Sequence, residues 1–387
     1  MTSSSTPSPR TPALPSDRRA ALVIWWLSRI TLVLLTIVSA HVLHDTVEGG
    51  WRALVSRWQH WDADYYVQLA QSGYPRVVAG QPGVVAFFPG EPAALRVVHL
   101  VVRNWTLAAL VVSAAAGSVA VSALARLTAY EDGSGHGELA ERTVLYFVLS
   151  PFAVFLAAGY SESLFLAFAL TAWLAARRDR WAAAGILAGL SATVRITGLF
   201  LGIALLVEHL VVRQRAGKSL VDRQTAWLAG PFVATAAYFG YLQHLTGDWA
   251  AWVHAQAGPP WARHLTLPWH ALSATWSAAT DVNQPAPYAW SFGQEIVAVA
   301  VGLVLTVVLV RRRRWGETVY VGGQVLAFAL SGFYLSVGRG TLLWWPLWLL
   351  LAKASLRKGW VHRAYLTVAP ALMVTYVIAF TGGGWVG

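Results

Sequence analysis

Two apolar stretches decide the fold class of this chain. Residues 143–176 read TVLYFVLSPFAVFLAAGYSESLFLAFALTAWLAA, and residues 181–212 read WAAAGILAGLSATVRITGLFLGIALLVEHLVV. A helix needs about 20 residues to cross the hydrocarbon of a bilayer. Each stretch therefore predicts either two short spans or one broken hairpin whose irregular turn lines a cavity. Neither stretch alternates with a period of two, so the spans are expected to be helical.

The composition extends this prediction to the whole chain. Of the 387 residues, 12% are charged and 56% are hydrophobic. An ordinary soluble domain carries about 25% charged residues. Too few polar residues remain to cover a globule of this size, which excludes a soluble enzyme. The chain is predicted to be an all-α polytopic membrane protein.

We predict about 11 transmembrane helices, with a range of 9–13. Residues 1–19 are rich in Ser, Thr and Pro and are predicted to form a disordered cytoplasmic tail. Residues 20–387 are predicted to form a single integral membrane domain. The predicted spans are residues 21–42, 94–125, 143–158, 162–176, 181–194, 198–212, 224–246, 291–310, 318–336, 341–352 and 364–380.

The distribution of basic residues predicts the orientation. If the N-terminus is cytoplasmic, 20 of the 29 Lys and Arg residues fall in cytoplasmic segments. This agrees with the positive-inside rule and places two long loops, residues 43–93 and 247–290, outside. Their Trp and Tyr residues favour interfacial helices. The net charge of +11 is thus explained by topology and contact with anionic lipids, not by nucleic acid. We expect a multi-pass protein of the plasma membrane.

The first outer loop contains two candidate catalytic acids. Residues 57–66 read RWQHWDADYY. A helix over residues 62–71 would place Asp62, Tyr65, Tyr66 and Leu69 on one face, with Asp62 beside a cavity. Asp64 lies nearby. The alternative is an interfacial helix whose acidic side chains face water.

Other charged residues stand at the outer ends of predicted spans. Glu91 follows an aromatic turn, and Glu162 follows Tyr160 and Ser161 at the start of an apolar helix, where a carboxylate also suits simple helix capping. Arg195 and Arg339 interrupt apolar segments. Each either extends its charge to the membrane surface or binds a phosphate group, which matches the planar guanidinium.

The sequence lacks the motifs of several common kinds of functional site. The chain has no Cys, which excludes disulfides and thiolate sites. No H-E-x-x-H, Walker or Rossmann pattern occurs. No ligand set for a metal is visible, although a divalent metal is compatible with the chemistry considered below, and no cofactor is predicted.

Four motifs in order resemble the PIG-V mannosyltransferases, members of the GT-C superfamily of lipid-dependent glycosyltransferases. They are Trp61-Asp62-Ala63-x-x-Tyr66, Ala86-Phe87-Phe88-Pro89-Gly90 with Pro92, the segment from Ser150-Pro151 to Ser163, and Arg195-x-x-Gly198. The similarity is strongest over residues 57–200. This chain departs from the family pattern at Ile196-Thr197, and its C-terminal half matches only in hydropathy and loop layout.

The resemblance implies a GT-C-like fold and polyprenyl-phosphate mannose as the donor. It also implies that a first-loop acid is the general base, which is carried over to Asp62 with Asp64 as a helper. The acceptor would be a hydroxyl of a glycolipid, glycan or protein on the outer face, and the reaction would invert the anomeric centre. Arg195 and Arg339 would neutralise the lipid phosphate. We assign Glu91, Glu162, Tyr65, Tyr66 and Tyr160 to substrate binding.

Two alternatives stay open at this point. A transporter or flippase of a lipid-linked sugar would also span the membrane, but it is expected to carry charges near the midplane and often repeated halves. A GT-C enzyme that uses another sugar, such as glucose or arabinose, would share the same motifs.

Overall fold

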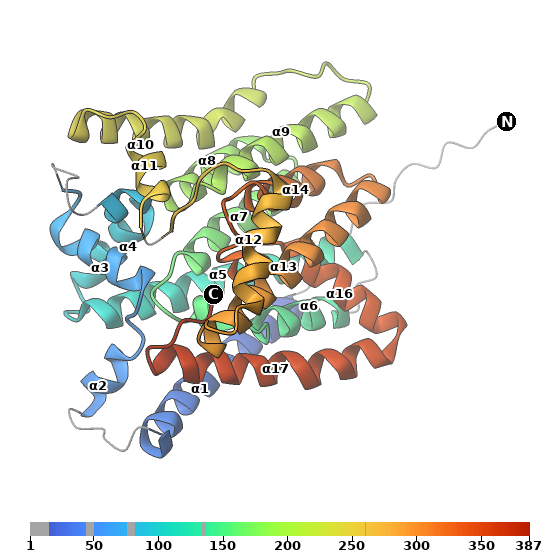
Figure 1. The fold of residues 1–387 in the computed structure, drawn as a ribbon. Helices are drawn as coiled ribbons and strands as arrows, with labels where there is room; N and C mark the ends of the chain where they lie inside the picture. Colours follow the sequence, from blue (N-terminus) through green and yellow to red (C-terminus); the bar gives the residue numbers. More distant parts are fainter. Residues whose placement is uncertain (1–14, 44–49, 76–81, 133–136, 260) are drawn as a thin grey trace.

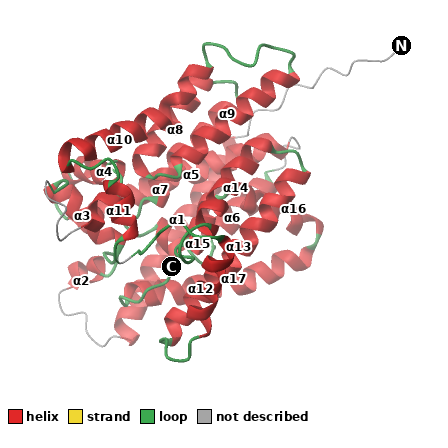
Figure 2. Cartoon of the chain, turned by 45° about the horizontal axis from the view of Figure 1, so that its top comes forward, coloured by secondary structure: helices red, strands yellow, loops and turns green. Residues whose placement is uncertain are grey.

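The computed structural model describes residues 15–43, 50–75, 82–132, 137–259 and 261–387, and in this part of the chain every named element is a helix (Figures 1 and 2). The only extended pairing there is an isolated antiparallel bridge between Leu265 and Ser331. The all-helical prediction is therefore confirmed for the described residues.

Four of these helices are long and apolar enough to cross a membrane: α1 (Pro15–Leu43), α5 (Trp105–Asp132), α13 (Ala286–Arg311) and α17 (Gly359–Thr381). Two shorter apolar helices are α7 (Glu162–Ala176) and α8 (Trp181–Val194). These helices agree with a multi-pass membrane protein. The total of about 11 crossings stays a prediction.

The remaining helices of the bundle follow most of the predicted boundaries. A break at Ser150-Pro151 divides the predicted span 143–158 into a helix and a short 3₁₀ segment, because Pro cannot continue the hydrogen-bond ladder. These elements are α6 (Glu138–Val148), η2 (Ala153–Leu156), α9 (Gly198–Arg215), η3 (Thr225–Ala229), α10 (Gly230–Thr246), α14 (Trp315–Ala329), α15 (Val337–Gly340), η4 (Thr341–Leu343) and α16 (Trp345–Arg357).

Several predicted boundaries differ from the structure. Helix α14 ends at Ala329, before the end of the predicted span 318–336, and α16 covers Trp345–Arg357 where the predicted span was 341–352. The predicted span 94–125 is two helices, α4 (Gly90–His99) and α5. The side chain of Asn104 accepts a hydrogen bond from the backbone N–H of Leu107 at 2.9 Å, which starts a new helix at this point. At the N-terminus, helix α1 already begins at Pro15, so the last five residues of the predicted tail are helical. Residues 1–14 lie outside the described part.

The two long loops contain helices that pack against each other. The first holds α2 (Gly50–Ser56), α3 (Asp62–Ser72) and η1 (Pro82–Ala86), and the second holds α11 (Ala251–Ala257) and α12 (Pro268–Thr280). The indole N–H of Trp252 donates to the backbone carbonyl of Ala86 at 3.1 Å. The ring of Trp261 packs on Tyr65. Residues 44–49, 76–81 and 260 of these loops lie outside the described part.

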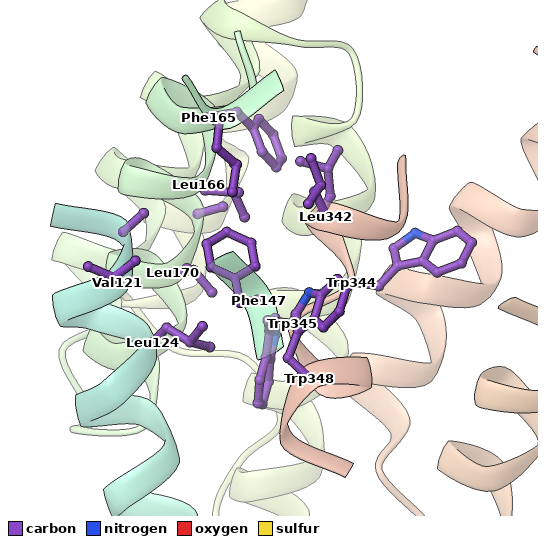
Figure 3. Packing of buried hydrophobic residues seen from close by; sticks show 14 of the residues in the cluster. Val121, Leu124, Phe147, Phe165, Leu166, Leu170, Leu342, Trp344, Trp345 and Trp348 are labelled. Atoms are coloured by element: carbon purple, nitrogen blue, oxygen red, sulfur yellow. The ribbon is translucent and has the colours of Figure 1, made fainter. Parts of the chain in front are cut away.

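Helix α7 lies at the centre of the bundle. Most of its side chains are buried, as expected for a helix that is apolar on all sides. In Figure 3, its residues Phe165, Leu166 and Leu170 face the core together with Phe147 and the tryptophans around the start of α16. Because α7 is surrounded, its first residue, Glu162, lies in the interior of one end of the bundle, where it is fully buried.

Candidate active site

Four charged side chains from four separate elements meet at this end of the bundle. Nη1 of Arg339 donates to Oδ2 of Asp62 at 2.6 Å. Nη1 of Arg195 donates to Oε1 of Glu162 at 2.7 Å and to the hydroxyl of Ser161 at 2.8 Å. The same Glu162 oxygen lies 3.1 Å from Nε of Arg339, although that N–H is not aligned for a hydrogen bond. We call Asp62, Glu162, Arg195 and Arg339 the charged cluster.

Local structure explains why each member of the charged cluster stands where a helix starts or ends. Asp62 and Glu162 are the first residues of α3 and α7, where the helix dipole favours a negative charge. Arg195 follows α8 in an extended conformation. Arg339 lies in the one-turn helix α15. None of these charged side chains therefore lies in the middle of a long apolar helix.

Arg339 is the central member of the charged cluster. It is buried, and its guanidinium carbon lies 5.3 Å from the ring centroids of both Phe155 and Tyr160. Burial alone would lower the pKa of Arg339, but the charges of Asp62 and Glu162 outweigh burial and raise it. Arg339 is thus held as a cation in an aromatic and acidic surrounding.

Glu295 holds the short helix that carries Arg339. The carboxylate of Glu295, on α13, accepts hydrogen bonds from the backbone N–H groups of Ser336, Val337 and Gly338, at 2.7, 2.6 and 3.1 Å. We did not predict this positioning role. The available signal was an acidic residue inside an apolar helix, which needs partners there.

The backbone before Asp62 is strained. Trp61 has a φ of 57°, in the left-handed region that is unfavourable for a bulky side chain. The hydroxyl of Tyr160 donates to the carbonyl of His60 at 3.2 Å, which ties this turn to the start of α7. Burial lowers the pKa of His60, so a neutral imidazole is favoured beside the cluster. Such strain is found where the surrounding structure fixes a functional residue.

Glu91 is buried close to the charged cluster. It is wholly inaccessible, and neither of its carboxyl oxygens has a hydrogen-bond partner within the described residues. The same is true of Oε2 of Glu162. Burial raises the pKa of Glu91 well above its ordinary value, and the charge of Glu162 raises it further. Burial therefore favours the protonated form of Glu91, which can donate one hydrogen bond and accept others.

A third arginine, which we did not predict, lies beside the cluster. Arg263 comes from the second long loop, and its guanidinium contacts the side chain of Gln256 and the carbonyl of Leu335, at 3.3 and 3.2 Å. Burial, followed by the charge of Arg339, lowers the pKa of Arg263 to about 10. Among the described residues Arg263 forms no direct ion pair, and the charges of Asp62 and Glu295, which act from a greater distance, offset only part of the lowering of its pKa.

The other predicted site residues divide into two groups. Tyr160 and Tyr66 are buried at the cluster, and burial raises the pKa of both hydroxyls. Tyr65 is half-buried and stacks on Phe87, with ring centroids 5.0 Å apart. Asp64 is exposed and accepts a hydrogen bond from Gln59 at 3.0 Å, so it is not part of the charged cluster.

A cavity lies next to the turn that carries Asp62. This cavity, of about 340 Å³, is lined by His60, next to Trp61 and Asp62, together with Ser56, Arg57, Thr381 and Gly382. Across the described part of the chain, no group of three or more His, Asp or Glu side chains is placed to hold a metal ion.

Comparison with known proteins supports the resemblance stated above. A family model described as Mannosyltransferase (PIG-V) matches residues 30–229, which include Asp62, Glu91, Glu162 and Arg195. Arg263, Glu295 and Arg339 lie beyond the matched range.

Similar curated proteins cover part of the chain. The GPI alpha-1,6-mannosyltransferase 2 of Cricetulus griseus is 33% identical over 171 residues, which are 42% of this chain and 33% of that protein. That of Rattus norvegicus is 35% identical over 155 residues, 38% of this chain and 30% of that protein. The GPI mannosyltransferase 2 of Yarrowia lipolytica is 36% identical over 100 residues, 26% of this chain and 28% of that protein. The chain thus aligns with about a third of the length of these relatives.

Proposed function

Because the chain belongs to the PIG-V family of mannosyltransferases, we propose that it transfers a mannosyl unit from polyprenyl-phosphate mannose to an acceptor hydroxyl. The acceptor belongs to a glycolipid, a glycan or a protein. The observation that carries this proposal is the charged cluster, in which two acids and two arginines from distant parts of the chain meet at one end of an apolar bundle.

Arg195, Arg339 and Arg263 would bind the donor phosphate. A guanidinium has five N–H donors, and the ion pairs described above use only some of those on Arg195 and Arg339. Arg263 adds a positive charge that forms no direct ion pair in the described structure. All three arginines therefore have donors for phosphate oxygens, and Arg195 and Arg339 would stabilise the negative charge that grows on the leaving phosphate.

Asp62 would act as the general base. Arg339 binds its Oδ2, and among the described residues its Oδ1 accepts no hydrogen bond. In the proposed step, the acceptor oxygen forms a bond to the anomeric carbon while the bond from that carbon to the phosphate oxygen breaks. The acceptor proton goes to Asp62, and the lipid phosphate leaves without protonation. Displacement from the opposite face inverts the anomeric centre, so a β-linked donor gives an α-mannoside.

Glu91 and Glu162 would recognise sugar hydroxyls. Three oxygens of these two side chains are buried without partners in the described structure, and a buried unpaired oxygen is unfavourable by about 1–3 kcal/mol. Hydroxyl groups of a bound sugar would satisfy them. Tyr65, Tyr66 and Tyr160 would supply the aromatic surface around the sugar ring.

The proposed site faces the outside of the plasma membrane, with the N-terminus in the cytoplasm. The positive-inside rule supports this orientation. Nucleotide sugars are cytosolic, so a reaction on the outer face needs a donor carried on a lipid, as proposed here.

A transfer assay with three lipid-linked sugars tests the proposal. Membranes that contain the full chain are incubated with an acceptor extract and radiolabelled polyprenyl-phosphate mannose, glucose or arabinose. We expect label in the product only from the mannose donor, and its release by an α-specific mannosidase. Membranes without the protein are the control.

Two results would contradict the proposal. Transfer from the glucose or arabinose donor at the same rate as from the mannose donor would show that the enzyme is not specific for mannose. Movement of labelled donor across protein-containing vesicles, with no transfer to any acceptor, would assign a transporter.

A further inference from the structure

A second cavity lies at the other end of the bundle. It has a volume of about 1100 Å³, and its walls come from the ends of α5, α9 and α13 and the starts of α8 and α14. Helix α7 starts at Glu162 in the charged cluster and ends next to Arg177 in this cavity. Its 15 residues correspond to a separation of about 22 Å. In Figure 1, the turns that line the cavity lie opposite helices α3 and α4. This cavity is therefore separate from the candidate active site.

A network of ion pairs forms the floor of the cavity. Arg177 pairs with Glu131 at 3.0 Å and also with Glu208 and Glu317. Arg314 pairs with Glu317 at 2.6 Å and with Glu131 at 3.2 Å. The three glutamates are thus compensated by arginines, so they repel an anion in the cavity less than free carboxylates would.

The two aspartates near α8 and α9 are also bound within the protein. Asp222 pairs with Arg213 and accepts hydrogen bonds from the backbone N–H groups of Gln224 and Thr225. Asp179 accepts the indole N–H of Trp181 at 2.5 Å. The remaining acid of the walls is Asp132, at the end of α5.

Four further cations line the cavity and are not compensated in this way. All four are exposed, and none makes an ion pair with a residue that the structure describes. They are Arg215, Lys218, Arg312 and Arg313. Two come from the end of α9 and the segment after it, and two from the turn between α13 and α14. They are held on two separate segments, so the cavity has free positive charge on both of these walls.

The position of this cavity relative to the candidate spans indicates which kind of anion would bind there. The candidate spans α5 and α13 end at Asp132 and Arg311, next to its walls. The ends of spans lie at the level of the lipid headgroups. Trp181 and Trp315 also line the cavity, and Trp is typical of the membrane interface. Basic pockets between helices at this depth are suited to phosphorylated headgroups.

We propose that this cavity binds the phosphate-bearing headgroup of an anionic phospholipid, with Arg312 and Arg313 on one wall and Arg215 and Lys218 on another. The glutamates that pair with arginines form the floor of the cavity, and the exposed ring of Trp315 contacts the glycerol and the first carbons of the acyl chains. The inference does not depend on the proposed transferase activity, because it uses none of the residues of the charged cluster.

Native mass spectrometry of the full chain in detergent tests this binding. The probes are phosphatidylglycerol and phosphatidylcholine with the same acyl chains, and inorganic phosphate as a competitor. We expect the wild type to retain phosphatidylglycerol and not phosphatidylcholine. The double variant Arg312→Gln/Arg313→Gln should bind phosphatidylglycerol about tenfold more weakly. The matched control is Arg52→Gln/Arg103→Gln, which removes two exposed charges at the other end of the bundle and should bind like the wild type.

Three results would overturn the proposal. The first is equal retention of the two lipids by the wild type. The second is an equal loss of binding in the test and control variants, which would reflect total charge. The third is displacement of the lipid by inorganic phosphate, which would assign the cavity to a soluble phosphate compound. Thermal unfolding of both variants, read alongside, distinguishes lost binding from lost folding.

Discussion

At the scale of single residues, a substitution of Arg263 tests donor binding separately from the chemical step, because Arg263 carries a positive charge that forms no direct ion pair with the described residues. Arg263 lies beside Arg339, but it donates only to an amide oxygen and a backbone carbonyl. Replacement by Gln removes the positive charge and keeps a polar side chain at this position. Arg263→Gln should raise KM for the lipid-phosphate donor by about tenfold and change kcat less, because the charge acts on a phosphate present before and during the reaction.

The control for Arg263 is the conservative variant. Arg263→Lys keeps the charge and should recover a large part of the donor affinity. A fall in kcat with unchanged KM in Arg263→Gln would contradict a role in binding the donor.

The raised pKa of Glu91 predicts how the free energy of unfolding depends on pH. Its folded-state pKa lies above the ordinary value of 4.5, so the folded protein holds this proton more tightly than the unfolded chain. The contribution of Glu91 to stability is complete below pH 4.5 and is lost as the pH rises toward the folded-state pKa. Within that window the loss is about 1.4 kcal/mol per pH unit.

Glu91→Gln cannot ionise and should lack this loss. Its thermal unfolding temperature in detergent should therefore rise relative to the wild type as the pH increases from about 5 to about 8. Glu141→Gln, at an exposed position, is the control and should keep a constant difference. A constant difference for Glu91→Gln as well would show that Glu91 is already ionised.

At the scale of secondary-structure elements, the site depends on helix α15 being held by α13. Glu295→Gln replaces a carboxylate that accepts three backbone N–H groups with an amide, which should lower the free energy of unfolding by about 1–3 kcal/mol. Arg339 should lose its position, so kcat should fall together with stability. The neighbouring variant Gln294→Ala is the control. Full activity of Glu295→Gln would show that α15 does not need this anchor.

The elements also show which parts of the site could be predicted. Asp62, Glu162, Arg195 and Arg339 could each be found as a charged residue at the end of an apolar segment. Their contacts could not, because Asp62 and Arg339 are 277 residues apart and local periodicity carries no information on such pairs. Arg263 and Glu295 were missed, since neither belongs to a motif and both lie in the half of the chain that resembles the family only in hydropathy.

The predicted helix boundaries were wrong where a single polar residue starts a new helix. The predicted span 94–125 included the turn at Asn104, because hydropathy averaged over a window hides one capping side chain. The helix over residues 62–71 was predicted closely, since α3 covers Asp62–Ser72. The buried face of this helix includes Tyr66 and Leu69, as its spacing indicated.

At the scale of the whole molecule, the orientation in the membrane follows from the basic residues and is testable with single cysteines. The chain has no Cys, so an introduced thiol is the only one. Ser72→Cys lies at the exposed end of α3, and Ser219→Cys is exposed in the segment between α9 and α10. A membrane-impermeant maleimide should label Ser72→Cys on intact cells and Ser219→Cys only after permeabilisation. The reverse pattern would contradict the proposed orientation.

In the whole molecule, the proposed chemistry lies at one end of the bundle and the proposed lipid contact at the other, and the chemistry depends most on Asp62. The deciding measurement is mannosyl transfer from radiolabelled polyprenyl-phosphate mannose by membranes with matched amounts of wild type, Asp62→Asn or Asp248→Asn. Asp248 is half a chain away and pairs with His254, so its variant should transfer at the wild-type rate. Asp62→Asn keeps the shape of the side chain and removes the base, so its rate should fall by about 10²–10⁴-fold. Transfer by Asp62→Asn at the wild-type rate would contradict the account.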